Sequence, residues 1–279
     1  MNISSTIALS TLRDSTRPRN SPQIKSLRGV PNAPRIYILA VAPNYLNEPK
    51  ENWLLGPPED VTFLKDMLSD CAYIDIKTLC GPEATGDDIL WETGRILHWS
   101  RRGDLIIIYL SGHGATNDRG PTGYEFFAQS TRDPVGSRHN TLTYQVLLRH
   151  IINHQTRGSY VLVIRDTCEA GPTEGEILAM LGYPADISII VLAACDSGEK
   201  TWECGNKPPR SVFLQNIISA VGRLWQDKVH ALSDLVVRMI DQVLRPIVVG
   251  GVRQTPRLEP DANRSKVLVP LSIGGSALI

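Results

Sequence analysis

The chain has 279 residues, 42% of them hydrophobic, and its 29 Lys and Arg residues balance 29 Asp and Glu residues. This composition suffices for a sizeable core, but the neutral charge gives no electrostatic basis for binding nucleic acid or an anionic membrane surface. No run approaches the ~20 apolar residues of a membrane-spanning helix, and five scattered cysteines indicate a reducing, cytoplasmic setting rather than a disulfide framework.

Residues 1–34 are rich in Ser, Thr, Arg, Pro and Asn, lack the features of a secretory signal, and predict a flexible tail. A single domain is expected over residues 35–279. Strands are predicted at 36–42, 73–79, 104–112, 124–128, 159–167, 187–194 and 267–273. Helices are predicted at about 59–68, 85–99, 143–151, 213–225 and 231–244. Strands that alternate with helices predict a three-layer α/β fold, with a mostly parallel central sheet flanked by helices.

Two of these helices have recognisable starts. Thr85 and Asp88 have the spacing of a capping box. Either Thr141 or Thr143 could cap the third helix, whose apolar positions recur at the spacing of one helix face. These apolar positions are Tyr144, Leu147, Leu148 and Ile151.

The most informative stretch runs from Asp104 to Gly114. Its apolar residues, rich in β-branched Ile, are typical of a strand buried on both faces. The strand ends in a small-residue loop that carries His113 between Gly112 and Gly114. Because glycine tolerates unusual backbone angles, this loop can present the imidazole to an open cleft.

A second apolar strand, beginning after Ser159, ends in a loop that carries Cys168. If both strands belong to one parallel sheet, their carboxyl ends lie at the same edge, where α/β proteins build their sites. A His and a Cys at that edge can form a thiolate–imidazolium pair. Asp166, two residues before the thiol, is either an acceptor that caps the loop or the floor of a pocket for a basic side chain.

Other chemistries fit the sequence less well. It contains no Gly-x-x-x-x-Gly-Lys-Ser/Thr loop, no Gly-x-Ser-x-Gly elbow, and no glycine fingerprint for a dinucleotide after the first strand. His150 and His154 are one helical turn apart but lack a third metal ligand nearby. Cys195 and Cys204 do not have a zinc-binding spacing, and Cys195 is expected in the core.

These residues make the chain resemble the metacaspase-type members of the caspase-like cysteine peptidases, over roughly residues 35–260 in motif order. The segment 109–114, Tyr-Leu-Ser-Gly-His-Gly, resembles the histidine motif of that family, and the segment 166–171, Asp-Thr-Cys-Glu-Ala-Gly, its cysteine motif. The resemblance implies that His113 and Cys168 are catalytic. It also implies that Asp60, in a segment similar to an early family loop, binds a basic substrate residue together with Asp166.

The sequence departs from the family pattern at three places. Glu169 stands where family members usually carry a His. Acidic residues that could bind calcium are thinly spread after the histidine motif, which argues against calcium dependence; they are Asp118, Glu125 and Asp133. The segment 166–199 contains no Lys or Arg, so cleavage after a basic residue cannot occur within it.

The sequence therefore predicts a cysteine endopeptidase that cleaves peptide or protein substrates after Arg or Lys. His113 would accept and return a proton, Cys168 would attack, and backbone N–H groups of Gly114 and Cys168 would form the oxyanion hole. No metal or other cofactor is expected. One alternative is a caspase-like interaction module with an impaired site, which Glu169 favours. Another is a small-molecule thiol hydrolase, which would need a closed pocket.

Overall fold

The computed structural model describes residues 35–68, 74–116, 124–128, 141–168, 188–195, 199–201, 203–204, 209–226, 247–249 and 252–259. The predicted tail, the helix at 231–244 and the strand at 267–273 lie outside these ranges. Among the described helices, none is long and apolar enough to cross a membrane.

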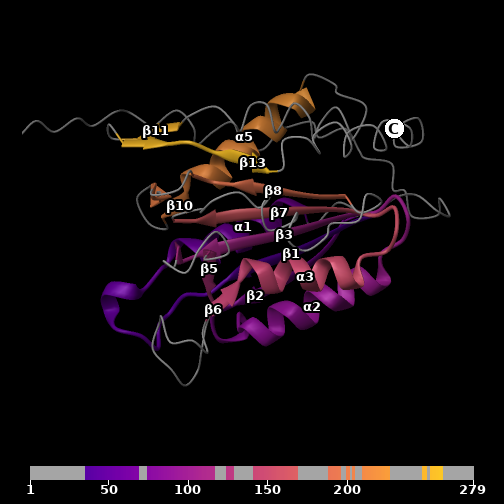
Figure 1. Cartoon of the computed structure of the whole chain (residues 1–279). Coiled ribbons are helices and arrows are strands. Elements are labelled where there is room, and N and C mark those ends of the chain that lie inside the picture. Colours follow the sequence, from indigo (N-terminus) through magenta and orange to yellow (C-terminus); the bar gives the residue numbers. More distant parts are fainter. Residues whose placement is uncertain are drawn as a thin grey trace, which may run out of the picture.

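A six-stranded sheet in the order β13-β8-β7-β3-β1-β2 forms the centre of the fold (Figure 1). Among the described strands of this sheet, β1, β2, β3, β7 and β8 pair in parallel, whereas β13 runs antiparallel to its neighbour β8. The bounds are β1 (Ile36–Ala42), β2 (Ile74–Cys80), β3 (Leu105–Gly112), β7 (Tyr160–Thr167), β8 (Ser188–Ala193) and β13 (Arg257–Glu259).

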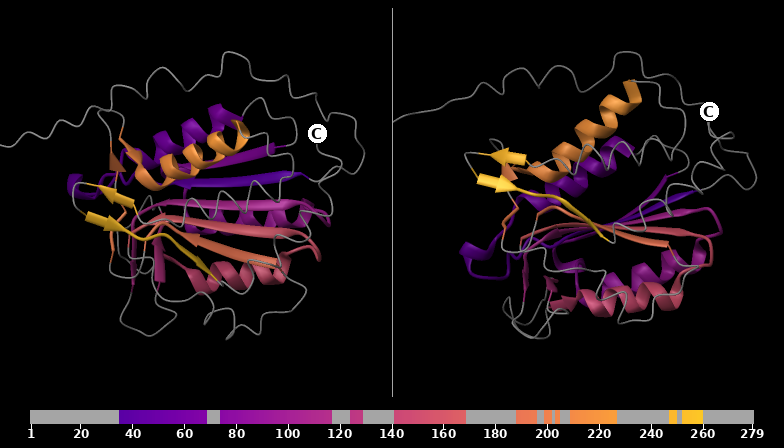
Figure 2. Two further views of the ribbon diagram at one scale, coloured as in Figure 1. Left: turned by 90° about the horizontal axis from the view of Figure 1, so that it is seen from above. Right: turned by 45° about the horizontal axis from the view of Figure 1, so that its top comes forward.

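In the described part of the chain, helices cover both faces of the sheet, which gives the predicted three layers (Figure 2). The helices α1 (Gly56–Leu68) and α5 (Val212–Gln226) lie on one face, and α2 (Gly86–Trp99) and α3 (Tyr144–His154) lie on the other. Alternate strand residues belong to two separate apolar clusters, one under each helix pair. The predicted fold class is therefore confirmed, because strands buried on both faces need a helical layer on each side.

Helix starts follow the local sequence. Thr85 accepts a hydrogen bond from the backbone N–H of Asp88 at 3.1 Å, as the capping box predicts. Thr143, rather than Thr141, caps α3 by accepting from the backbone N–H of Val146 at 3.3 Å. The α1 helix begins at Gly56, about three residues before its predicted start, because prolines suit a first helical turn.

Several short elements lie outside the central sheet. A three-stranded sheet packs beside the carboxyl end of β3 and consists of β4 (Gly114–Thr116), β5 (Tyr124–Phe127) and β6 (Thr141–Thr143). The strand predicted at 124–128 is confirmed as β5, whereas β4, β6 and the short elements below were not predicted. Two small ribbons pair β9 (Glu203–Cys204) with β10 (Arg210–Ser211), and β11 (Ile247–Val249) with β12 (Val252–Gln254). Short 3₁₀ turns lie at η1 (Lys50–Asn52) and η2 (Gly81–Glu83).

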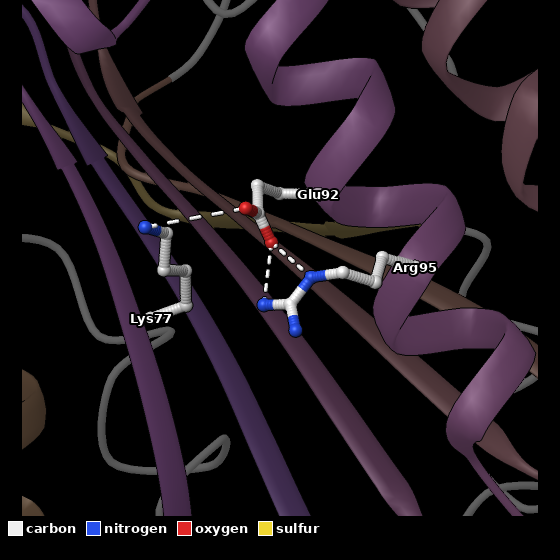
Figure 3. Close-up of polar contacts among 3 residues, drawn as sticks. All are labelled: Lys77, Glu92 and Arg95. Carbon is white, nitrogen blue, oxygen red and sulfur yellow. Dashed lines mark hydrogen bonds and ion pairs between the residues drawn. The ribbon is translucent and has the colours of Figure 1, made fainter.

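A surface cluster joins α2 to the edge strand β2 (Figure 3). The Glu92 carboxylate accepts a hydrogen bond from Arg95 Nε at 2.6 Å and lies 4.0 Å from Lys77 Nζ. Such partly exposed pairs contribute at most about 1 kcal/mol. This cluster therefore orients the helix on the sheet edge more than it stabilises the fold.

Candidate active site

The register of two central strands places His113 beside Cys168. In the parallel pairing of β3 with β7, Ser111 faces Asp166 and Gly112 faces Thr167. The next residue on each strand is His113 and Cys168, and both are half-buried. The carboxyl ends of the two strands therefore bring the predicted imidazole and thiol to the same edge of the sheet.

The imidazole of His113 is held by the loop that follows β1. Its Nε2 lies 2.9 Å from the backbone carbonyl oxygen of Asn52. Because a carbonyl can only accept, Nε2 carries the hydrogen, and the neutral ring keeps its lone pair on Nδ1. The ring is therefore fixed in the tautomer whose Nδ1 can accept a proton.

Tyr45 also contacts His113. Its hydroxyl accepts a hydrogen bond from the backbone N–H of His113 at 3.0 Å and donates to the carbonyl oxygen of Phe127 at 2.6 Å. The tyrosine and imidazole rings have centroids 4.7 Å apart. A methyl group on Gly112 would meet the Tyr45 hydroxyl at 2.8 Å, so glycine is needed there for close approach.

The thiol of Cys168 lies against a segment that follows β8. Its Sγ is 3.7 Å from Oγ1 of Thr201, within the range of a weak hydrogen bond to sulfur. Nearby, Glu199 accepts hydrogen bonds from the backbone N–H of Thr255 at 2.7 Å and from its hydroxyl at 3.0 Å. Thr255, which lies just before β13, thereby holds Glu199 and the segment that carries Thr201.

Asp60 and Asp166 lie together on the α1 face of the sheet and form an acidic site. Asp60 is 1% exposed, and its two oxygens accept from the backbone N–H of Ser211 at 3.0 and 3.2 Å. Asp166 is 3% exposed and accepts from the hydroxyl of Tyr109 at 2.9 Å. The structure thus brings together two residues that are 106 positions apart in the sequence (166 − 60).

The electrostatics of this acidic site are unusual because its carboxyl groups share a poorly hydrated space. Burial first, and the charge of Asp166 second, raise the pKa of Asp60 from its ordinary 3.8 to about 8. Burial also raises the pKa of Asp166 to about 6, although hydrogen bonds from Ser211 and Tyr109 oppose the rise. A bound cation would favour the ionised form of both groups.

A third carboxyl group, on Glu203, belongs to the same site and was not predicted. Loss of hydration and the charge of Asp166 raise its pKa, and a methyl group on Gly56 would clash with its carboxylate. The guanidinium of Arg210 lies 4.0 Å from the centre of the Phe63 ring. Its charge lowers the pKa of Asp60, but this effect is the smallest of those that shift the pKa of Asp60. The site is therefore acidic overall.

The remaining candidate residues are placed as follows. Cys195 is fully buried, and its Sγ lies 3.4 Å from the carbonyl oxygen of Thr167, as expected of a core residue. His150 and His154 stack with ring centroids 4.2 Å apart.

In the described part of the chain, no group of three or more His, Cys, Asp or Glu residues could hold a metal ion. Glu169, Asp118 and Asp133 lie outside the described residues.

A mostly parallel α/β sheet that carries a histidine and a cysteine on adjacent strand ends is the architecture of a caspase-like cysteine peptidase. The chain belongs to the Caspase domain family (Peptidase_C14), whose sequence profile matches residues 43–267. Members of this family are cysteine peptidases, so the predicted family is confirmed at this level. The metacaspase subgroup remains a prediction.

Solved structures resemble the fold at low sequence identity. Protein GSU0716 from Geobacter sulfurreducens is 15% identical with a TM-score of 0.54, over 83% of this chain and 96% of that chain. Caspase-1 from Spodoptera frugiperda is 10% identical with a TM-score of 0.49, over 82% of this chain and 90% of that chain. No curated protein matches the sequence at a significant level.

Proposed function

We propose that this protein is a cysteine endopeptidase that cleaves peptide bonds after Arg or Lys. The observation that carries the proposal is the register of β3 against β7, which leaves His113 beside Cys168. Asp166 lies two residues before Cys168 on the same strand. Nucleophile, base and acidic pocket would then act on neighbouring atoms of one substrate.

In the proposed reaction, Nδ1 of His113 accepts the proton of the Cys168 thiol, and the sulfur attacks the substrate carbonyl carbon. The imidazolium then returns the proton to the leaving amine, which releases the first product and leaves a thioester. Water, deprotonated by the same imidazole, hydrolyses the thioester. The hydrogen bond from Nε2 to Asn52 would keep the ring in place throughout.

Backbone N–H groups of Gly114 and Cys168 are the proposed oxyanion donors. The N–H of Phe127 donates to the carbonyl oxygen of His113 at 3.1 Å. Hydrogen-bonded and non-hydrogen-bonded residue pairs alternate along an antiparallel ladder, so the next pair, Gly114 and Phe126, exchanges no hydrogen bonds. Within the described strands, this pairing does not use the N–H of Gly114. That group is therefore suited to stabilise the tetrahedral intermediate.

The acidic site supports the choice of a basic residue before the cleaved bond. Asp60 and Asp166, which are buried, and Glu203, which is more exposed, bring three carboxyl groups together, and their raised pKa values oppose ionisation until a cation binds. A guanidinium or ammonium group would satisfy these carboxylates, whereas an acidic side chain would be repelled. We further propose that the protein acts without calcium in a reducing, cytoplasmic setting; the described cysteines, Cys80, Cys168 and Cys195, are all free thiols.

Hydrolysis of fluorogenic peptides tests this function. Peptides that differ only in Arg, citrulline or Asp before the reporter should rank in that order, with and without calcium, and Cys168→Ala should abolish turnover. Absence of turnover on every peptide by the folded wild-type protein would contradict the proposal. It would instead support the interaction module that Glu169 suggested in the sequence.

A further inference from the structure

We infer that Tyr45 is the residue that positions the imidazole of His113, and that its hydroxyl is needed for full reactivity of Cys168. The inference rests on the proposed function only in that His113 serves as the base. Tyr45 follows β1 by three residues and is fully buried. The contacts that carry the inference are those of its hydroxyl and its ring with His113.

One hydroxyl group connects two strand ends at this point. The Tyr45 hydroxyl accepts from the His113 N–H at 3.0 Å and donates to the Phe127 carbonyl at 2.6 Å. The first bond fixes the backbone at the end of β3, and the second ties that backbone to β5. A small displacement of the His113 backbone would therefore require breaking a partly buried hydrogen bond, which is unfavourable.

The aromatic ring restrains the imidazole itself. The two rings lie with centroids 4.7 Å apart and planes 37° apart, a tilted contact that limits rotation of the imidazole. Asn52, seven positions along the same loop, restrains Nε2 through its carbonyl oxygen. The loop of residues 44–54, closed by a bond of 3.2 Å from the Leu54 N–H to the Asn44 carbonyl, thus holds the ring at its backbone, face and edge.

The local backbone indicates that this arrangement is enforced. Tyr45 has a φ of 56°, in the left-handed region that L-residues other than Asn and Asp rarely occupy. Such a conformation costs of order 1–3 kcal/mol and persists where surrounding contacts determine it. Gly112 supplies the necessary space, because a side chain there would meet the Tyr45 hydroxyl.

The test compares Tyr45→Phe, which keeps the ring and removes the hydroxyl, with Tyr37→Phe. Tyr37 is also buried and belongs to β1, but it is unrelated to His113 by any described contact. Two properties are measured for each folded variant. The first is the alkylation rate of Cys168 by iodoacetamide at neutral pH, with Cys80 as the internal reference thiol. The second is kcat and KM on an Arg peptide.

For Tyr45→Phe we expect Cys168 alkylation and kcat to fall about 10- to 100-fold, with KM within twofold and Cys80 unchanged. Tyr37→Phe should match the wild type. Unchanged Cys168 alkylation in Tyr45→Phe would overturn the inference, as would an equal loss at Cys80, which would show that the effect is not specific to Cys168. The alkylation result stands even if the wild type cleaves no peptide, so failure of the proposed function is recognised separately.

Amide hydrogen exchange of the wild-type protein provides a test that needs no variant. The His113 N–H should exchange at least about 100-fold more slowly than in an unstructured peptide, because its acceptor is a buried hydroxyl. An unprotected His113 amide would contradict the inference whether or not Tyr45→Phe folds.

Discussion

Tyr109 donates a hydrogen bond of 2.9 Å to Asp166, and this bond lies in the buried layer between the sheet and α1. Burial and the charges of both aspartates raise the pKa of Tyr109 well above its ordinary value of 10, so its hydroxyl remains a donor at all physiological pH values. The bond orients a carboxyl group that burial keeps partly protonated. The acidic site is therefore held in shape before any substrate enters it.

Selectivity for a basic residue should increase with pH. The raised pKa values of Asp166, about 6, and Asp60, about 8, mean that both carboxyl groups ionise as pH rises from 5.5 to 9. A guanidinium is attracted to the ionised groups, whereas citrulline, its neutral isostere, is not. The ratio of kcat/KM for matched Arg and citrulline peptides should rise across this range. Because His113 and Cys168 act on both peptides, their own pH dependence cancels in this ratio. A ratio that does not change with pH would contradict recognition by the two carboxyl groups.

Fold stability should decrease over the same pH range. A raised folded-state pKa means that the folded protein binds more protons than the unfolded chain between about pH 4 and 8, so unfolding releases protons. The stabilisation is complete below pH 4 and is lost as pH rises through the folded pKa. Asp60 should contribute a slope of up to about 1.4 kcal/mol per pH unit. Urea unfolding of Asp60→Asn should show a shallower decline than the wild type; an identical slope would argue against the shifted pKa.

Removing the charge of Asp166 should impair cleavage after Arg specifically. Asp166→Asn keeps an acceptor for Tyr109, so the fold should persist, yet kcat/KM for the Arg peptide should fall by at least ~100-fold, or about 2.7 kcal/mol. The citrulline peptide should lose much less. Asp75→Asn, a change at an exposed position of β2, is the matched control and should have no effect. Equal losses on both peptides would assign Asp166 a role other than recognition.

A methyl group at position 112 should disturb the site from the other side of Tyr45. In Gly112→Ala the new Cβ would lie 2.8 Å from the Tyr45 hydroxyl and 3.2 Å from Phe126 and Pro43. Overpacking of this kind costs typically about 1–3 kcal/mol. We expect a lower melting temperature and slower alkylation of Cys168. Gly86→Ala, where nothing lies within 4 Å of the added atom, should change neither quantity. Wild-type behaviour of Gly112→Ala would show that the Tyr45 contact is not tight.

The chain should not cut itself between its two halves. Residues 166–199 contain no Lys or Arg, whereas residues 1–34, which are predicted to form a flexible tail, contain Arg13, Arg17, Arg19, Lys25 and Arg28. Incubation with and without calcium, followed by mapping of fragment ends, should therefore show trimming before residue 35 only. Fragments that end between 166 and 199 in the wild type, but not in Cys168→Ala, would show that cleavage after basic residues is the wrong specificity.

The long elements could be predicted because their patterns are local. The apolar runs of β1, β3 and β7 and the stripes of α2 and α3 each extend over seven or more residues. The strands β4, β6, β9 and β10 contain only two or three residues, and they exist because a partner strand pairs with them. Pairing between distant segments leaves no periodic pattern in such short stretches.

The same distinction applies to the site. His113 and Cys168 could be chosen as candidates, and their placement at one sheet edge predicted, because each directly follows a recognisable strand. Tyr45 and Glu203 could not, because their roles depend on contacts that fold and register create. The hydrogen bond from the backbone N–H of His113 to the Tyr45 hydroxyl, for example, joins residues 68 positions apart. The available local signal was that Tyr45 lies in the loop directly after β1, near the sheet edge that carries the site, where functional residues are common.

The most direct test of the central claim is covalent labelling with an Arg peptide that carries an acyloxymethyl ketone warhead. Such a reagent reports the pocket and the nucleophile together, because only a bound basic residue delivers the warhead to the activated thiol. Peptide mapping by mass spectrometry should find about one adduct per chain, on Cys168. The label should disappear in His113→Ala and weaken in Asp166→Asn, while Asp75→Asn labels normally. Labelling of Cys80 or Cys195 in place of Cys168, or equal labelling by a matched Asp reagent, would contradict the account.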